Sequence, residues 1–187
     1  RDVLLAGCRS SWSDLAPTRV IASVSDSACA AALQHEQPDV ILVFGTGKLP
    51  RPVISAATVA CLNLHGGDPE YYRGLDTHLW SIYYRDFHRL VTTLHHVDEG
   101  LDTGDIVLQQ RLPNAAGRHL HELRSMNTEV CVELSLNALA ALAADGRIPA
   151  RMQTRRGQFF SHMPAALKSA CVERFREYLH AEHPAPR

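Results

Sequence analysis

The chain has 187 residues, of which 45% are hydrophobic, and this is enough for one compact domain with a real core. Nineteen basic and twenty acidic residues give a net charge of -1, so the sequence lacks the basic surface that binding to nucleic-acid phosphates requires. It also shows no signal-peptide pattern and no apolar run of the ~18 residues that span a membrane. We therefore expect a cytoplasmic protein with neither a nucleic-acid nor a membrane partner.

Short apolar runs that are rich in β-branched residues follow one another along the chain, separated by helical patterns. The expected strands are Asp2–Ala6, Arg19–Val24, Asp39–Phe44, Ala60–Leu64, Leu90–Val97 and Asp105–Gln109. Nearly continuous apolar runs are typical of strands that helices cover on both faces. Three of the runs have this character: Val20–Val24, Val40–Phe44 and Val59–Leu64.

The segments between the strands carry helix signals. Ser25 or Asp26 can cap a helix over Ala28–Gln37, which Pro38 stops. Further helices are expected over Pro50–Ala57, Leu75–Asp86, Arg118–Ala144 and Pro164–His180. The alternation predicts an α/β, Rossmann-like fold with a largely parallel sheet. We expect one domain over residues 1–148, followed by a short helical C-terminal extension over residues 149–187.

The cysteines and histidines do not have the spacing of metal ligands. The five cysteines are scattered, odd in number and without a CxxC pair, so neither a disulfide framework nor a zinc ribbon is expected. His95 and His96 would face opposite sides of a strand, and His119 and His121 would not share a helix face. We therefore expect no metal site and assign the cysteines to the core.

Two polar residues stand at the end of one expected strand. Side chains alternate along Ala60–Leu64, so Asn63 and His65 point to the same side. The strand then breaks at Gly66-Gly67, and open parallel sheets bind ligands beyond the carboxyl ends of their strands. An amide and an imidazole at this edge could perform chemistry, or they could satisfy nearby loop backbone.

A second segment, Val97–Asp105, places four acidic residues and two glycines between two expected strands. A solvated acidic turn is one interpretation of this composition. A calcium loop is another, but the EF-hand spacing and its terminal glutamate are absent.

Together the two segments resemble the formyltransferase family that uses 10-formyltetrahydrofolate, which includes methionyl-tRNA, glycinamide-ribonucleotide, amino-sugar and hydroxyornithine formyltransferases. The likeness runs from about Pro38 to Gly146. It rests on Asn63-Leu64-His65, Tyr72-Arg73-Gly74 and Asp98–Gly104 followed by Ile106–Gln109. The resemblance implies the formyltransferase fold for residues 1–148 and a catalytic trio of Asn63, His65 and Asp102.

The family's reaction explains why these three residue types would be needed. An amine that attacks a formyl carbonyl generates a tetrahedral centre with a developing oxyanion, to which Asn63 and a protonated His65 could donate hydrogen bonds. The imidazole could also shuttle the proton that passes from the amine to the folate nitrogen. Asp102 would stabilise the charged imidazole and help to order a relaying water.

The rest of the site follows from the resemblance alone. The folate donor would contact a turn after one strand and the acidic loop, at Phe44, Gly45, Thr46, Leu49, Val97, Asp98, Glu99 and Leu101. The acceptor side would involve Gly66, Gly67, Arg73 and Gly74. Arg73 and Gly74 would also stabilise the loop over the site, and for Arg73 a structural ion pair is the alternative to substrate contact.

The sequence departs from the family pattern in two places. Gly66-Gly67-Asp68-Pro69 replaces the more usual Pro-Ser turn, which would reshape the acceptor pocket. Only 62 residues precede Asn63, fewer than usual by roughly one βα unit, so we expect an N-terminally shortened fold.

The resemblance implies an enzyme that transfers a formyl group from 10-formyltetrahydrofolate to a small-molecule amine, such as an amino sugar or a hydroxylamine of the hydroxyornithine type. The near-neutral charge and the short C-terminal segment argue against a tRNA acceptor. A formyltetrahydrofolate hydrolase and a folate-binding domain without catalysis are the alternatives. A homodimer is the assembly that we would expect.

Overall fold

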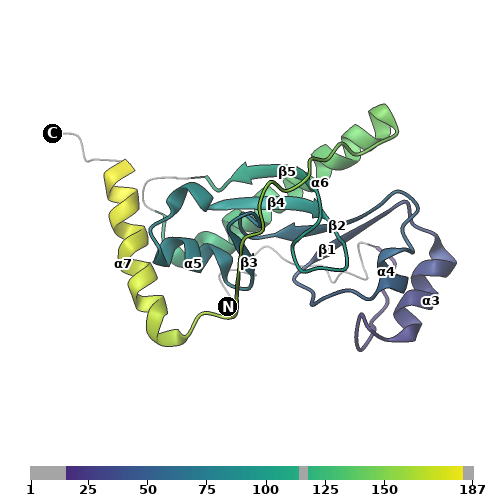
Figure 1. Cartoon of the computed structure of the whole chain (residues 1–187), viewed down its shortest axis with the longest axis horizontal. Helices are drawn as coiled ribbons and strands as arrows, with labels where there is room; N and C mark the ends of the chain where they lie inside the picture. The colour runs from purple at the N-terminus through teal and green to yellow at the C-terminus, as the bar shows by residue number, and fades with distance from the viewer. Residues whose placement is uncertain (1–15, 114–117, 183–187) are drawn as a thin grey trace.

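The computed structural model describes residues 16–113 and 118–182, and in this part the main sheet has the strand order β1-β2-β4-β5 (Figure 1). Its strands are β1 (Val40–Phe44), β2 (Ala60–His65), β4 (Val91–His96) and β5 (Ile106–Arg111). β1 and β2 run parallel, whereas β4 is antiparallel to both of its neighbours. A separate parallel pair joins β3 (Tyr72–Gly74) to β6 (Gln158–Phe160).

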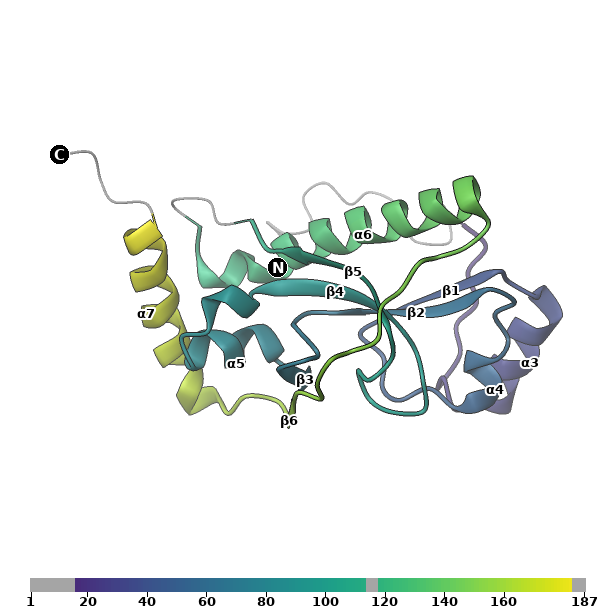
Figure 2. The ribbon, with the colours of Figure 1, turned by 45° about the horizontal axis from the view of Figure 1, so that its top comes forward.

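Helices lie on both sides of the main sheet, with α6 on one side and α5 on the other (Figure 2). The helices are α3 (Ser27–Glu36), α4 (Arg51–Ile54), α5 (Thr77–Tyr83), α6 (Leu123–Asp145) and α7 (Ala165–Glu182), with 3-10 turns η1 (Phe87–Arg89) and η2 (Leu120–Glu122). Local chemistry sets their ends. The Asp26 carboxylate accepts the Ala28 N–H at 2.9 Å where α3 begins, and Gly146 ends α6 with a φ of 68°.

The structure confirms the α/β fold class and most of the expected elements, with ends that differ by a few residues. The expected strand Arg19–Val24 is wrong, because this segment forms no strand and Val20 is 95% exposed. Its residues Ile21 and Val24 instead pack against the cluster that contains Cys29 and Val43. The sequence does not predict β3 or β6, since three residues are too few to show a period. The expected strand Asp2–Ala6, Cys8 and the tail after Glu182 lie outside the described residues.

The direction of the strands follows from their connections. The expectation of parallel strands holds for β1 and β2, whose connection contains α4. β4 and β5 are joined by the short loop 97–105 and therefore run antiparallel, so the described sheet is mixed. β1 forms one edge of the described sheet, and its Leu42 and Phe44 are exposed rather than covered on both faces as its apolar run predicts.

The larger hydrophobic cluster joins the sheet to α6 and α7. Leu62 of β2 and Leu94 of β4 are fully buried at its centre, and Phe175 of α7 is 2% exposed in the same cluster. Cys29, Cys61, Cys131 and Cys171 are free and buried, as expected for core cysteines. The expected boundary near residue 148 stays a prediction, although the segment beyond it contributes to this core. Within the described ranges, no helix has the length and apolarity to cross a membrane.

Truncating the core contact of α7 should destabilise the sheet as well as the helix. We expect Phe175→Ala to lower the free energy of unfolding by about 3–5 kcal/mol, because it leaves a cavity in the main cluster. Val172→Ala removes an exposed side chain from the same helix and should cost much less. Chemical denaturation followed by circular dichroism measures both values. Equal stabilities of the two variants would contradict this account of the core.

Candidate active site

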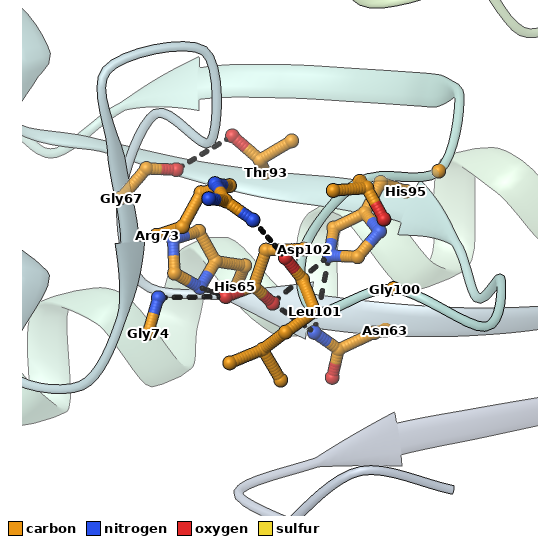
Figure 3. Close-up of polar contacts among 12 residues, drawn as sticks. Asn63, His65, Gly67, Arg73, Gly74, Thr93, His95, Gly100, Leu101 and Asp102 are labelled. Carbon is orange, nitrogen blue, oxygen red and sulfur yellow. Dashed lines mark hydrogen bonds and ion pairs between the residues drawn. The ribbon is translucent and has the colours of Figure 1, made fainter. Parts of the chain in front are cut away.

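Polar side chains from β2, from β4 and from the loop between β4 and β5 lie close together (Figure 3). Asn63 and His65 lie on β2. Leu62, the residue before Asn63, belongs to the larger hydrophobic cluster. The β2–β4 register places Asn63 opposite His95. Asp102 comes from the loop between β4 and β5. The alternation of β2 and the register of β4 therefore direct one amide and two imidazoles toward a single carboxylate.

The loop that carries Asp102 is held in a compact shape. The Asp98 carboxylate accepts the Gly100 N–H at 2.9 Å and the Thr103 hydroxyl at 2.6 Å. Gly104 lies so close to β4 that an added Cβ would stand 1.9 Å from the carbonyl oxygen of His96. Asp102 itself has a φ of 53°, in the left-handed region that residues with a Cβ rarely adopt. The surrounding contacts therefore stabilise an unfavourable backbone conformation at this residue.

The Asp102 carboxylate lies between the other polar groups. Its Oδ1 is 3.4 Å from Asn63 Nδ2 and 3.5 Å from His95 Nε2. Its Oδ2 is 3.6 Å from His65 Nδ1 and accepts the Gly74 N–H at 2.8 Å. The structure thus confirms that Asn63, His65 and Asp102 come together. Their catalytic roles stay a prediction.

His95 is the site residue that the sequence did not reveal. Its side chain is buried, and its Nε2 lies 3.1 Å from Asn63 Nδ2. The sequence shows only an adjacent pair, His95-His96, whose members point to opposite faces of a strand. Which of the two faces Asn63 depends on the β2–β4 register, and no local pattern contains this information.

The hydrogen-bond partners of the two histidines decide which ring nitrogen carries the proton. A carbonyl oxygen only accepts, so His65 Nε2 donates to Tyr72 O at 2.9 Å and His95 Nδ1 donates to His96 O at 2.7 Å. In the neutral rings, His65 Nδ1 and His95 Nε2 are then unprotonated, and both face Asp102. Each ring can therefore accept a proton at a position where the carboxylate stabilises the resulting charge.

Burial and charge act against each other at these groups. Burial lowers the pKa of His65 below its usual value, although the Asp102 charge partly opposes this effect. Burial would raise the pKa of Asp102, but the interactions with His95, His65 and the Gly74 N–H outweigh it and lower the pKa. Near pH 7 the site thus holds an ionised carboxylate beside a neutral His65.

A pocket opens beside this cluster, between the turn after β1 and the β4–β5 loop. It is lined by Val43, Thr46, Gly47, Lys48, Leu49, Asn63, His95, Val97, Asp98, Gly100, Leu101 and Asp102. Five of the expected donor-binding residues are among them: Thr46, Leu49, Val97, Asp98 and Leu101. Phe44, Gly45 and Glu99 are not part of this lining. His65 is absent from it as well, so of the four clustered residues Asn63, His95 and Asp102 line the pocket.

The four residues expected on the acceptor side make structural contacts. Arg73 is buried and donates to the carbonyl oxygens of Leu101 and Gly157 at 3.0 and 2.7 Å. It therefore contacts the β4–β5 loop through hydrogen bonds and not through an ion pair, and its expected stabilisation of that loop stays a prediction. Cβ atoms at Gly66, Gly67 and Gly74 would crowd His78, Thr77 and Phe160, respectively. The neighbouring residues therefore pack closely against the backbone of the three glycines. An acceptor role for the four residues stays a prediction.

Replacing Asp102 should change the protonation of His65. We expect Asp102→Asn to lower the pKa of His65 further, because burial then acts without the opposing carboxylate charge. Nuclear magnetic resonance titration of the imidazole nitrogens measures this value. Asp105→Asn, which neutralises an exposed carboxylate near the same loop, serves as the control. A His65 pKa that rises or stays constant in Asp102→Asn would contradict the proposed pairing.

Comparisons with known proteins identify relatives of this chain. A methionyl-tRNA formyltransferase from Ralstonia nicotianae is 32% identical over 149 residues, which are 77% of this chain and 44% of that relative. The chain spans about a third to a half of the length of the curated relatives it matches.

Solved structures show the same fold at lower identity. A formyltransferase from Anoxybacillus kamchatkensis, in complex with UDP-4,6-dideoxy-4-formamido-L-AltNAc and tetrahydrofolate, has a TM-score of 0.56 at 23% identity and covers 66% of this chain and 64% of its own. A 4-N formyltransferase from Francisella tularensis has a TM-score of 0.60 at 17% identity and covers 78% of this chain and 64% of its own. The family model "Formyl transferase" matches residues 15–136. The chain therefore belongs to the formyl transferase family.

Proposed function

We propose that the protein transfers a formyl group from 10-formyltetrahydrofolate to a primary amine or hydroxylamine of a small molecule, of the amino-sugar or hydroxyornithine type. The observation that carries this proposal is the meeting of Asn63, His95 and Asp102 at one pocket, with His65 behind the carboxylate. Membership of the formyl transferase family supports the same chemistry. The four residues combine a hydrogen-bond donor, two proton acceptors and a charge that stabilises the protonated ring.

The pocket suits the pterin ring of the folate donor. Val43, Leu49, Val97 and Leu101 supply apolar walls, and we expect the turn and loop between them to offer backbone donors and acceptors. A pterin is flat and carries donors and acceptors along its edges, so such backbone groups can recognise it. The tetrahydrofolate in the Anoxybacillus kamchatkensis structure supports a folate donor for this chain as well.

The proton balance of formyl transfer assigns complementary roles to the two histidines. The amine nitrogen forms a bond to the formyl carbon, loses a proton, and the folate nitrogen that leaves gains one. His95 lines the pocket, and its Nε2, beside Asn63 Nδ2, would accept the amine proton. His65 Nδ1 lies on the other side of the same carboxylate and can hold a proton there. Asp102 stabilises either imidazolium, so the proton stays within the site until the leaving nitrogen takes it.

Protonation of His95 would also free the oxyanion donor. Asn63 Nδ2 directs its N–H groups toward His95 Nε2 and Asp102 Oδ1 at 3.1 and 3.4 Å. A protonated His95 Nε2 no longer accepts, so one N–H of Asn63 becomes available to the formyl oxygen. Amine deprotonation and oxyanion stabilisation would then occur together, at the moment when the negative charge develops.

A tRNA-linked acceptor is the second candidate. It is favoured by the curated relatives, which are methionyl-tRNA formyltransferases. The small-molecule acceptor is favoured by the near-neutral net charge of -1, since binding to phosphates draws on a basic surface. Turnover with UDP-linked amino sugars, hydroxyornithine and methionyl-tRNA separates the candidates. Formate release without any acceptor would instead indicate a hydrolase.

Removal of a site residue should reduce turnover without unfolding the protein. We expect Asn63→Ala and Asp102→Ala each to lower kcat by ~100–1000-fold, because each removes a group that stabilises charge in the transition state. His65→Ala and His95→Ala test the two proton-accepting positions. Glu129→Gln, an exposed change on α6, is the control. Wild-type rates in Asp102→Ala with unchanged stability would show that the cluster is structural.

The donor site can be tested without any acceptor. We expect 5-formyltetrahydrofolate, the unreactive isomer of the donor, to bind in the pocket and to be weakened by Leu101→Ala, which removes an apolar wall. Isothermal titration calorimetry measures the Kd, and Leu136→Ala on the exposed side of α6 is the matched control. No binding by the wild-type protein at millimolar folate would overturn the donor assignment. Binding of folate without transfer to any amine would favour the hydrolase or the non-catalytic folate-binding domain.

A further inference from the structure

The segment between α6 and α7 crosses the sheet beside the candidate active site (Figure 2). We call residues 151–160 the strap. At one end its Arg151 exchanges two backbone hydrogen bonds of 2.8 Å with Ile106, the first residue of β5. At the other end it forms β6, which pairs with β3. The strap is therefore attached to the first residue of β5, which follows the Asp102 loop, and to β3.

Buried groups fix the strap between these ends. The Glu70 carboxylate accepts from Arg151 Nη2 at 2.8 Å, and from the N–H and hydroxyl of Thr154 at 2.6 and 2.7 Å. These interactions lower the pKa of Glu70 to about 2, with the Arg151 hydrogen bond as the largest cause. Gly157 packs so closely that an added Cβ would lie 2.5 Å from Pro69 O. The backbone of the strap therefore packs directly against the backbone of Pro69 and Tyr71 at Gly157.

One strap side chain reaches the loop of the catalytic carboxylate. Gln153 Nε2 donates to the carbonyl oxygens of Asp102 and Gly104, at 3.0 and 2.9 Å. A single side-chain amide therefore joins the two carbonyls on either side of Thr103. Asp102 is the residue with a φ of 53°, so this contact acts where the loop backbone is least favourable.

The strap also supports Asp102 from the side of its carboxylate. β6 pairs with β3, and Gly74 at the end of β3 donates its N–H to Asp102 Oδ2 at 2.8 Å. Arg73 links the strap to the β4–β5 loop, since it donates to Gly157 O in the strap and to Leu101 O in the loop. Asp102 is therefore held at its backbone by Gln153 and at its side chain by a strand that the strap pairs with.

We propose that Gln153 is a positioning residue, which holds the Asp102 loop in its left-handed conformation and so keeps the carboxylate between His65 and His95. This role deepens the formyl transfer proposed above and rests on it for its catalytic meaning. Without the two hydrogen bonds, the Asp102 backbone can relax toward a negative φ, and a backbone change of this kind swings the carboxylate away from both rings.

The test measures the histidines and needs no substrate. The imidazole nitrogen chemical shifts of nitrogen-15-labelled protein are recorded at pH 7 for the wild type, Gln153→Ala, Asp102→Asn and Met152→Ala. Signals are assigned with His65→Gln and His95→Gln. We expect Gln153→Ala to shift the His65 and His95 signals in the direction that Asp102→Asn shifts them. Met152 is 75% exposed in the same strap, so Met152→Ala should leave them at wild-type positions.

Wild-type histidine signals in a folded Gln153→Ala protein would overturn the proposal. If Gln153→Ala does not fold, the same spectra of Gln153→Glu decide, because this variant keeps the side-chain size and removes both N–H donors. In turnover we expect Gln153→Ala to lose roughly 10- to 100-fold in kcat through misplacement of Asp102, with an unchanged Kd for 5-formyltetrahydrofolate. Failure of the wild type to bind this folate would remove the proposed function, whereas unchanged histidine signals with intact folate binding would remove only the role of Gln153.

Discussion

A single buried carboxylate determines the arrangement of the site. The Asp102 side chain is 7% exposed, and burial by itself disfavours its charge. The structure compensates with two donors to the carboxylate, the Gly74 N–H at 2.8 Å and Asn63 Nδ2 at 3.4 Å. These donors stabilise the ionised form, and the charge can in turn stabilise a proton on His65 or His95, whose ring nitrogens lie 3.6 and 3.5 Å away. The chemistry and the stability of the site therefore depend on the same contacts.

The two rings occupy different positions around this charge. His95 lies on the pocket side with Asn63, whereas His65 is buried behind the carboxylate and hydrogen bonded to Tyr72 O. Each ring has one nitrogen committed to a backbone carbonyl and one facing Asp102. In the proposed formyl transfer, a proton would enter at the pocket and be held on either side of the carboxylate, as a transfer between two nitrogens requires.

A loop with an unfavourable backbone conformation can hold this geometry only if other segments support it. The β4–β5 loop is closed internally by Asp98, and externally by Arg73 and Gln153. Gln153 belongs to a segment that the sequence alone places in a C-terminal extension. In the structure this segment pairs with β3, and the helix after it, α7, packs in the larger hydrophobic cluster. The segment is therefore packed against the elements that carry the site.

The sequence by itself determined the local elements and the identity of the main polar residues. The alternation of β2 directs Asn63 and His65 to one side, and the glycines and acids of residues 97–105 indicate a turn between two strands, because these signals lie in contiguous residues. Only the tertiary structure decided that His95 faces Asn63, that His65 stands behind Asp102, and that Gln153 donates to the backbone carbonyl of Asp102, 51 residues away. It also showed that the apolar run Arg19–Val24 is not a strand. Register and long-range contacts arise from the packing of whole elements against each other, and no short stretch of sequence encodes them.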